Sequence, residues 1–292
     1  MADVTITGKT CMISDDQLVD LRRRVRPWLM QGVDDAYSQL PIERAALVRD
    51  LENNFLTRNN MCTALNPQQQ ATVEDHNTLR DHYRGNGVEA AEARRLGIVV
   101  KTFDIPRGPA WCPANTSCEV MLDAFDDDAL PAVMFATNML DAQAKEALLN
   151  PSYGNFMSRY EHGAPVVCRE RGATYHAIDV GVATLEFVTL SVVHDHWSTF
   201  SLQSTCTDAA GNQYQPDDLI VSFGLRVFVP VTVSIDGQEV SRTLIIDSVA
   251  SEPSNAILRA LIPTAMATRR FTATNIARKL FLDARAQGWS VR

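Results

Sequence analysis

The sequence predicts an α+β protein, in which a helical domain built from both chain ends carries an inserted antiparallel β-sandwich. Two observations predict this class. Apolar residues recur at helical spacing in residues 14–96 and again after Pro253. Between these regions, residues 98–249 have a shorter, strand-like period and are rich in β-branched side chains. With 292 residues, the chain is long enough for one large domain or two ordinary ones.

Four helices are predicted in the N-terminal region, and each has a start or stop signal typical of helices. The signals are Ser14 or Asp15 as the cap of the first helix, Pro27 as its end or kink, Pro41 and Pro67 in the first turns of the second and third, and Gly97 after the fourth. The second helix carries an apolar stripe from Ala45 to Phe55, which must face other apolar residues.

The central region contains about eight to ten predicted strands and one short helix at residues 141–149. The clearest strands lie at residues 98–103, 119–122, 133–136, 165–168, 183–193, 199–206, 219–235 and 240–246. Asp236-Gly237 is a tight hairpin signal before the last of them, and Pro230 marks an edge or a bulge. Many short strands at this spacing favour a sandwich of the jelly-roll type over a parallel sheet.

Helices return after Pro253, with one over residues 255–261 and a last one that Thr272 or Thr274 caps. Neither helical region covers its own apolar stripe, so the simplest arrangement packs the two regions together. We therefore predict one helical domain, made of residues 1–97 and 251–292. Residues 98–250 form the inserted β-sandwich (jelly-roll) domain.

Composition excludes several classes of protein. The chain has 27 Lys and Arg against 35 Asp and Glu, and this net charge of -8 argues against a dedicated nucleic-acid binder. No apolar run is long enough to span a membrane. The six cysteines are scattered without a C-x-x-C pair, which argues against a zinc ribbon. The N-terminus lacks the pattern of a signal peptide, so we expect reduced thiols in a cytosolic setting.

The best candidate for a metal site is His194-Asp195-His196, because residues two apart on a strand point to the same side. His176 and Asp179 would complete such a site only if the fold brings them near. The pattern is similar to the H-x-H of cupins, but the glutamate and glycine of that pattern are absent. We favour a strand end or a subunit contact. We therefore predict no metal, with His194, His196 and His176 as the candidates if one binds.

No motif identifies a reaction. The glycine-rich phosphate loops and the G-x-S-x-G elbow are absent, and Cys112 and Cys118 have no histidine base beside them. Cys168 and Cys206 lie in predicted strands and are expected in the core. The arginines of residues 22–26 are interpreted as a solvated helix face or a contact for an acidic partner, and residues 126–128 as a solvated acidic turn. We predict no catalytic residues, no cofactor and no enzymatic activity.

The order of elements resembles one family, the T=13 shell proteins of double-stranded RNA viruses of the reovirus order. The resemblance covers the whole chain at the level of element order, and residues 225–263 look like the final jelly-roll strands of that family running back into a helix. It implies a structural capsid protein, a homotrimer that tiles an icosahedral shell and contacts neighbouring trimers and an inner-shell capsid protein. It also implies location in the virion, and in the host cytoplasm during assembly, without direct contact with nucleic acid or membrane. Aromatic residues that would form trimer contacts, if they are not core residues, are Trp28, Trp111, Trp197, Phe223, Phe228 and Trp289.

Two alternatives stay open from the sequence. The first is a jelly-roll enzyme or ligand-binding module with a metal or sugar site near His194 and His196, completed by His176. The second is an adaptor whose helices form a partner-binding surface. A bound transition metal would favour the first alternative, and a lack of self-assembly would separate the second from a capsid protein.

Overall fold

The computed structural model describes residues 3–7, 10–65, 111–113, 116–125, 166–179, 184–194, 196–257 and 259–260. Several predicted elements lie outside these residues. They are the third and fourth helices, the strands at residues 98–103 and 133–136, the helix at residues 141–149, the acidic turn at residues 126–128, Trp289 and the last helix.

The described residues form eleven strands and four helical segments in the order β1-β2-α1-α2-η1-α3-β3 to β11. The helical segments are α1 (Asp15–Ala36), α2 (Arg44–Asp50), the π-helix η1 (Leu51–Phe55) and α3 (Arg58–Leu65). The strands are β1 (Asp3–Thr7), β2 (Thr10–Met12), β3 (Ser117–Phe125), β4 (Val166–Val167), β5 (Ala173–Asp179), β6 (Thr184–Val193), β7 (Trp197–Gln203), β8 (Cys206–Thr207), β9 (Gln213–Tyr214), β10 (Leu219–Ile235) and β11 (Gln238–Pro253). Within the described residues, no helix is both long and apolar enough to cross a membrane.

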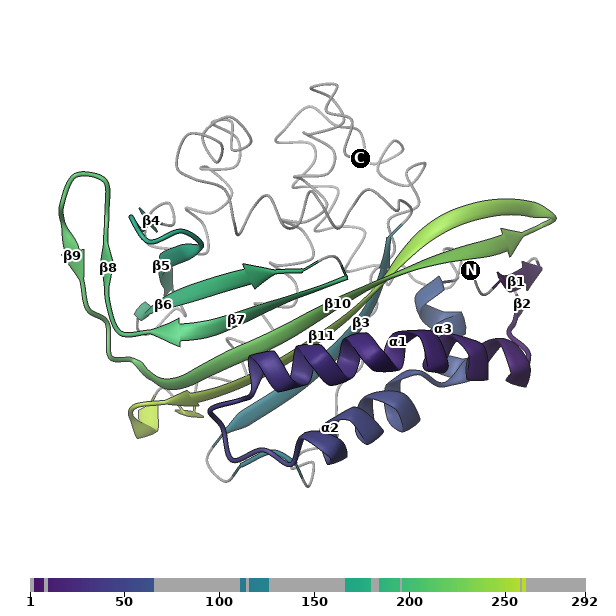
Figure 1. The fold of residues 1–292 in the computed structure, drawn as a ribbon, viewed down its shortest axis with the longest axis horizontal. Coiled ribbons are helices and arrows are strands. Elements are labelled where there is room, and N and C mark those ends of the chain that lie inside the picture. Colours follow the sequence, from purple (N-terminus) through teal and green to yellow (C-terminus); the bar gives the residue numbers. More distant parts are fainter. Residues whose placement is uncertain are drawn as a thin grey trace.

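Nine of the strands form one sheet, and β8 and β9 form a separate two-stranded ribbon. The long β10–β11 hairpin is the centre of the large sheet (Figure 1). One edge of this hairpin continues through β11 to β3. The other edge of β10 pairs β7 along its first half and β1, in parallel, along its last residues. From β7 the sheet continues through β6 and β5 to β4.

The β10–β11 hairpin confirms the turn that the sequence predicts. Asp236 and Gly237 have φ values of 50° and 80°, a backbone that suits the tight turn of an Asp-Gly hairpin. The turn fixes the register, so residues at equal distances from it face each other as far as Val221 and Glu252, beyond which an irregularity shifts the pairing by one residue. Pro230 lies between the part of β10 that pairs β7 and the part that pairs β1, where its missing N–H interrupts neither ladder.

Helix α1 begins where the sequence predicts. Ser14 and Gln17 form a capping box, in which each side chain accepts a hydrogen bond from the other residue's backbone N–H. Pro27 does not end the helix, which continues to Ala36, and it lies on the exposed side of α1. Arg22 also departs from its prediction, because its guanidinium donates two hydrogen bonds to the Leu56 carbonyl at 2.9 and 2.7 Å.

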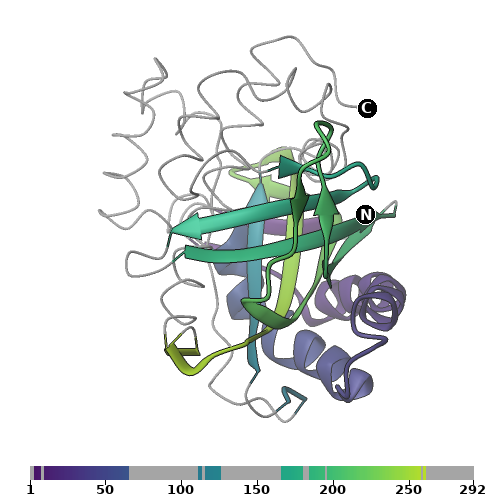
Figure 2. The same cartoon turned by 90° about the vertical axis from the view of Figure 1, so that its left-hand side faces the viewer.

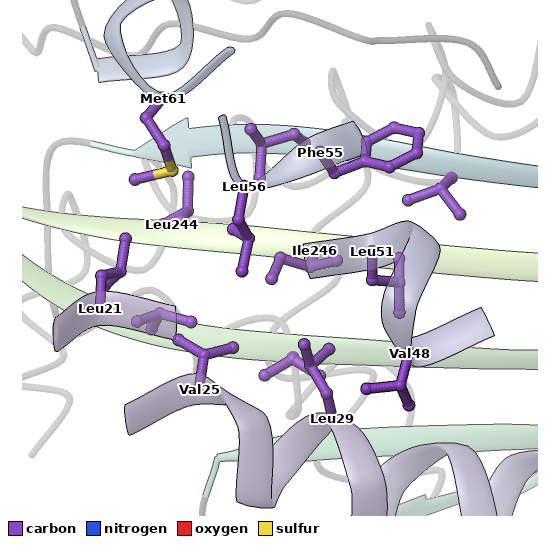
Figure 3. Packing of buried hydrophobic residues seen from close by; sticks show 14 of the residues in the cluster. Leu21, Val25, Leu29, Val48, Leu51, Phe55, Leu56, Met61, Leu244 and Ile246 are labelled. Carbon is purple, nitrogen blue, oxygen red and sulfur yellow. The ribbon is translucent and has the colours of Figure 1, made fainter. Parts of the chain in front are cut away.

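The described helices pack directly on one face of the sheet (Figures 1 and 2). Figure 3 shows Leu21, Val25 and Leu29 of α1 against Leu244 and Ile246 of β11, with side chains from α2, η1 and α3 closing the layer. Trp111 belongs to the same core, and Trp28, Trp197 and Phe223 pack against it. Phe228 is also buried, so the aromatic residues proposed as trimer contacts lie in or against the interior wherever they are described.

The predicted fold class is therefore wrong. In the described residues there is no separate helical domain and no pair of facing jelly-roll sheets. Among the described residues, the apolar stripe of α1 packs on the sheet, chiefly on β10 and β7, and beside α2. An amphipathic helix shows that it needs an apolar partner, but its sequence does not state whether that partner is a helix or a sheet.

The expectation of reduced cysteines is also contradicted, because all six form disulfides. The pairs are Cys11–Cys62, Cys112–Cys118 and Cys168–Cys206, with Cα–Cα separations of 5.1, 5.9 and 5.2 Å. Cys168 and Cys206 are buried, as expected of core residues, but they are bonded to each other.

Candidate ligand-binding face of the sheet

The two faces of the sheet differ in chemistry. Side chains alternate between faces along each strand, and the registers show which residues of neighbouring strands share a face. One face packs on the helices. The opposite face, which we call the mixed face, combines apolar, aromatic, hydroxyl and charged side chains. The residues used below are His176, Leu185, Phe187, Thr189, Phe200, Leu202, Ser222, Gly224, Arg226, Phe228, Ile245, Asp247, Val249 and Ser251, which are some of its members.

An aromatic ring lies over a glycine at the middle of the mixed face. Gly224 is opposite Phe200 on β7 and Val249 on β11. A Cβ atom at Gly224 would lie 1.9 Å from Cε1 of Phe200 and 2.1 Å from its Cζ. Phe200 therefore occupies the space that any other residue at position 224 would fill. This places the ring over β10, in a cluster that includes Val249.

The next row along the strands carries a buried ion pair. Arg226 and Asp247 face each other across the hairpin, and Nη2 of Arg226 donates to Oδ2 of Asp247 at 2.7 Å. The two side chains are only 14% and 3% exposed. The row beyond the pair is apolar, since Phe228 and Ile245 are 1% and 2% exposed. The ion pair thus lies between the aromatic row of Phe200, Gly224 and Val249 and the apolar row of Phe228 and Ile245. Each row is about 7 Å away along the strands.

One oxygen of this buried carboxylate is unsatisfied. Oδ1 of Asp247 is buried and accepts no hydrogen bond from any described residue. Buried polar atoms are nearly always hydrogen-bonded, and leaving one without a partner costs about 1–3 kcal/mol. The carboxylate is therefore prepared to accept one further hydrogen bond, from a donor that is not among the described side chains.

His176 lies on the same face, towards its β5 edge. Its Nε2 is 3.2 Å from the Thr189 hydroxyl, and its ring stacks on Phe187 with centroids 5.0 Å apart. The structure places this one of the three predicted histidines on the mixed face. It adds a polar group at a separate position from the Arg226–Asp247 pair.

His194 and His196 lie elsewhere, at the turn between β6 and β7. His194 stacks on Trp197, with its Nε2 3.5 Å from Oδ2 of Asp35 on α1. His196 stacks on Trp28 of α1, with ring centroids 4.0 Å apart. Both imidazoles thus hold the strand end against the helix. In the part of the chain that the structure describes, no three histidine, cysteine or acidic side chains are grouped to hold a metal ion. The absence of a metal stays a prediction.

A polar groove lies at the far end of the sheet. Its volume is about 370 Å³, and the disulfide Cys168–Cys206 lines it together with Arg169, Glu170, Thr205, Thr207 and Gln213. Nearby, Tyr175 stacks on Tyr214 at 4.5 Å. Burial and the neighbouring Glu186 raise the pKa of Tyr175 to about 12, so its hydroxyl stays protonated at neutral pH. The polar lining and its open shape make this groove a poorer ligand site than the mixed face.

Sequence reasoning missed Arg226 and Asp247 as site residues. The signal was present, because Arg226 interrupts an otherwise apolar strand and the Asp236-Gly237 turn fixes the register. Counting outward from that turn puts Arg226 opposite Asp247.

Comparison with known proteins places the chain near several solved structures. No family model and no curated protein matches the sequence. An aromatase/cyclase from Streptomyces is 9% identical, with 60% of this chain and 99% of that chain covered and a TM-score of 0.39. A major latex-like protein of Panax ginseng is 11% identical, with coverages of 60% and 98% and a TM-score of 0.34. A protein of Thermus thermophilus is 12% identical, with coverages of 57% and 98% and a TM-score of 0.38.

The observed fold corrects the predicted function. The capsid prediction depended on a helical domain carrying a jelly roll, and the structure has a single large sheet packed on helices instead. The prediction of a capsid shell protein is therefore wrong, and the viral role and shell contacts inferred with it are withdrawn. The homotrimer stays a prediction, since the structure contains one chain.

Proposed function

We propose that the chain is a ligand-binding module whose mixed face binds a neutral, ring-containing ligand with a hydroxyl group. The observation that carries the proposal is the buried, unsatisfied Oδ1 of Asp247 beside an aromatic row. This keeps one part of the open alternative from the sequence, a ligand-binding module. It moves the site from His194 and His196 to Arg226 and Asp247.

The charges of the pair select the ligand chemistry. Arg226 neutralises Asp247 and occupies its Oδ2, so the site needs no ligand charge. An anionic ligand would meet the carboxylate directly, and burying a cation would cost desolvation without a free partner charge. A neutral hydroxyl donates one hydrogen bond to Oδ1 and satisfies it. The Phe200 ring on one side and Phe228 with Ile245 on the other favour an aromatic or polycyclic body.

The proposal includes no reaction. Binding alone relieves the unsatisfied oxygen, and no chemical step on the ligand is needed to account for the arrangement. We keep the prediction that the chain is not an enzyme. Recovery of the ligand unchanged after incubation with the protein tests it, and a converted product would overturn it.

The test compares three ligands that share one ring system: naphthol, naphthalene and naphthoate. Affinities are measured by titration calorimetry or by competition with a fluorescent probe. Satisfying Oδ1 is expected to make naphthol bind about tenfold tighter than naphthalene, which corresponds to about 1.4 kcal/mol. Naphthoate is expected to bind more weakly than naphthol.

A matched variant locates the effect. Arg226→Met with Asp247→Leu removes both charges together, a change that often leaves stability unaltered or increased. This double variant should bind naphthalene as well as the wild type does and lose the preference for naphthol. Val19→Ala, at an exposed position of α1, is the control that should keep the preference. Equal affinity of the wild type for naphthol and naphthalene, or a preference that survives in the double variant, would contradict the proposal.

A further inference from the structure

The six cysteines of the chain are all described, and the structure pairs every one of them. The Cα–Cα separations of the three pairs lie between 5.1 and 5.9 Å, inside the range that a disulfide spans without backbone movement. Two of the pairs join residues 51 and 38 positions apart, so the fold brings them together. Complete pairing without a remaining thiol is the pattern of a disulfide framework.

We infer that the working form of this protein carries three disulfides and that the chain folds in an oxidising environment. Disulfides persist in such environments and are rare where thiols are kept reduced. The inference replaces the expectation of cytosolic thiols, and it does not depend on what the mixed face binds.

The two long-range links lie at different ends of the fold. Cys11–Cys62 joins β2 to α3, so it ties the β1–β2 edge to the helical layer. Cys168–Cys206 joins the segment between β4 and β5 to β8, at the edge of the sheet that β4 and β5 form. Cys112–Cys118 is local and connects the residues just before β3 to that strand.

Each link forms by oxidation of two thiols. With a small-molecule disulfide as oxidant, one cysteine thiolate attacks it and releases one thiol, giving a mixed disulfide. The partner cysteine thiolate then attacks the protein sulfur of that mixed disulfide and releases the second thiol. Two electrons and two protons leave the protein for each bond, and the oxidant is reduced to two thiols. Three equivalents of the oxidant complete the framework.

The test uses the whole chain, prepared without reductant through an oxidising secretory route. Thiols are labelled with a maleimide in denaturant before and after reduction, and unreduced peptides are identified by mass spectrometry. We expect no labelled cysteine before reduction and six after it, with peptides joined as 11–62, 112–118 and 168–206. The melting temperature should fall when a reductant opens the links.

Cysteine-to-serine variants distinguish a disulfide that stabilises the fold from two cysteines that are only close together. Cys11→Ser with Cys62→Ser should lower the melting temperature more than Cys112→Ser with Cys118→Ser, because the first pair closes the longer loop. Labelled thiols in the folded, unreduced protein would overturn the inference. So would other pairings, or a melting temperature that does not change after complete reduction.

Discussion

Substitution of Gly224 tests the structure of the mixed face most directly. Replacing it with alanine adds a Cβ atom 1.9 Å from Cε1 of Phe200, closer than any non-bonded contact allows. The Phe200 ring must then move off β10. Because this ring is one wall of the proposed site, the substitution should affect both stability and ligand affinity.

The size of the effect follows from two opposing terms. Forcing an extra methyl group into a packed site costs about 1–3 kcal/mol. Replacing glycine by alanine within a strand recovers about 0.5–1 kcal/mol of conformational entropy. The net loss in the free energy of unfolding for Gly224→Ala should therefore lie between about 0 and 2.5 kcal/mol, with a central value of about 1 kcal/mol. In a Phe200→Ala background the clash is gone, so the same substitution should be neutral or stabilising.

The assay is a double-mutant cycle from urea unfolding of the wild type, the two single variants and the double variant. We expect a coupling free energy of at least about 1 kcal/mol between positions 200 and 224. Equal costs of Gly224→Ala in the two backgrounds would refute the reasoning, because they would show that Phe200 does not lie over Gly224.

Three further predictions follow from other parts of the fold. Removing the Cys11–Cys62 link, which closes a 51-residue separation, should lower the free energy of unfolding by about 4 kcal/mol. Removing Cys112–Cys118, with its six-residue separation, should lower it by about 2 kcal/mol. Chemical unfolding of the two serine double variants compares these losses, and equal losses would contradict the ordering. Ser14→Ala removes the side-chain acceptor of the α1 capping box and should cost about 1 kcal/mol, whereas Ser38→Ala, outside that box, should cost less. Tyr175, with its pKa raised to about 12 from 10.0, should ionise later than an ordinary tyrosine. Its contribution to stability is complete below pH 10 and falls as the pH rises towards 12, because the unfolded chain has then lost a proton that the folded chain keeps. Ultraviolet titration of the wild type and of Tyr175→Phe measures the ionisation of Tyr175 by difference. An ionisation step of Tyr175 near pH 10 would contradict the assigned surroundings.

Local features of the fold could be predicted from the sequence, because local residues determine them. The start of α1 at Ser14 and the turn at Asp236-Gly237 each depend on a few neighbouring residues. Strands β6 and β10 also lie where β-branched, alternating residues indicate them. Pro27 is the local exception, since packing of the buried stripe of α1 on the sheet outweighs the hydrogen bond that proline removes.

Non-local features were predicted poorly for a physical reason. An apolar stripe shows that one helix face must be buried, but it does not show which element covers that face. This ambiguity led to the prediction of a separate helical domain. The pairing of Cys11 with Cys62 and of Cys168 with Cys206 depends on the final fold, which spacing alone does not reveal. The candidate site is an intermediate case. Hairpin register alone joins Arg226 to Asp247, but the burial that leaves Oδ1 unsatisfied needs the three-dimensional structure.

The most direct test of the central claim is to map ligand binding residue by residue. Backbone amide chemical shifts of the isotope-labelled protein would be followed while naphthol is added. We predict that the largest shifts occur in the adjoining rows of β7, β10 and β11, around Phe200, Arg226 and Asp247. Shifts concentrated at the groove beside Arg169 and Gln213, or at the turn of His194 and His196, would show that the mixed face is not the binding site.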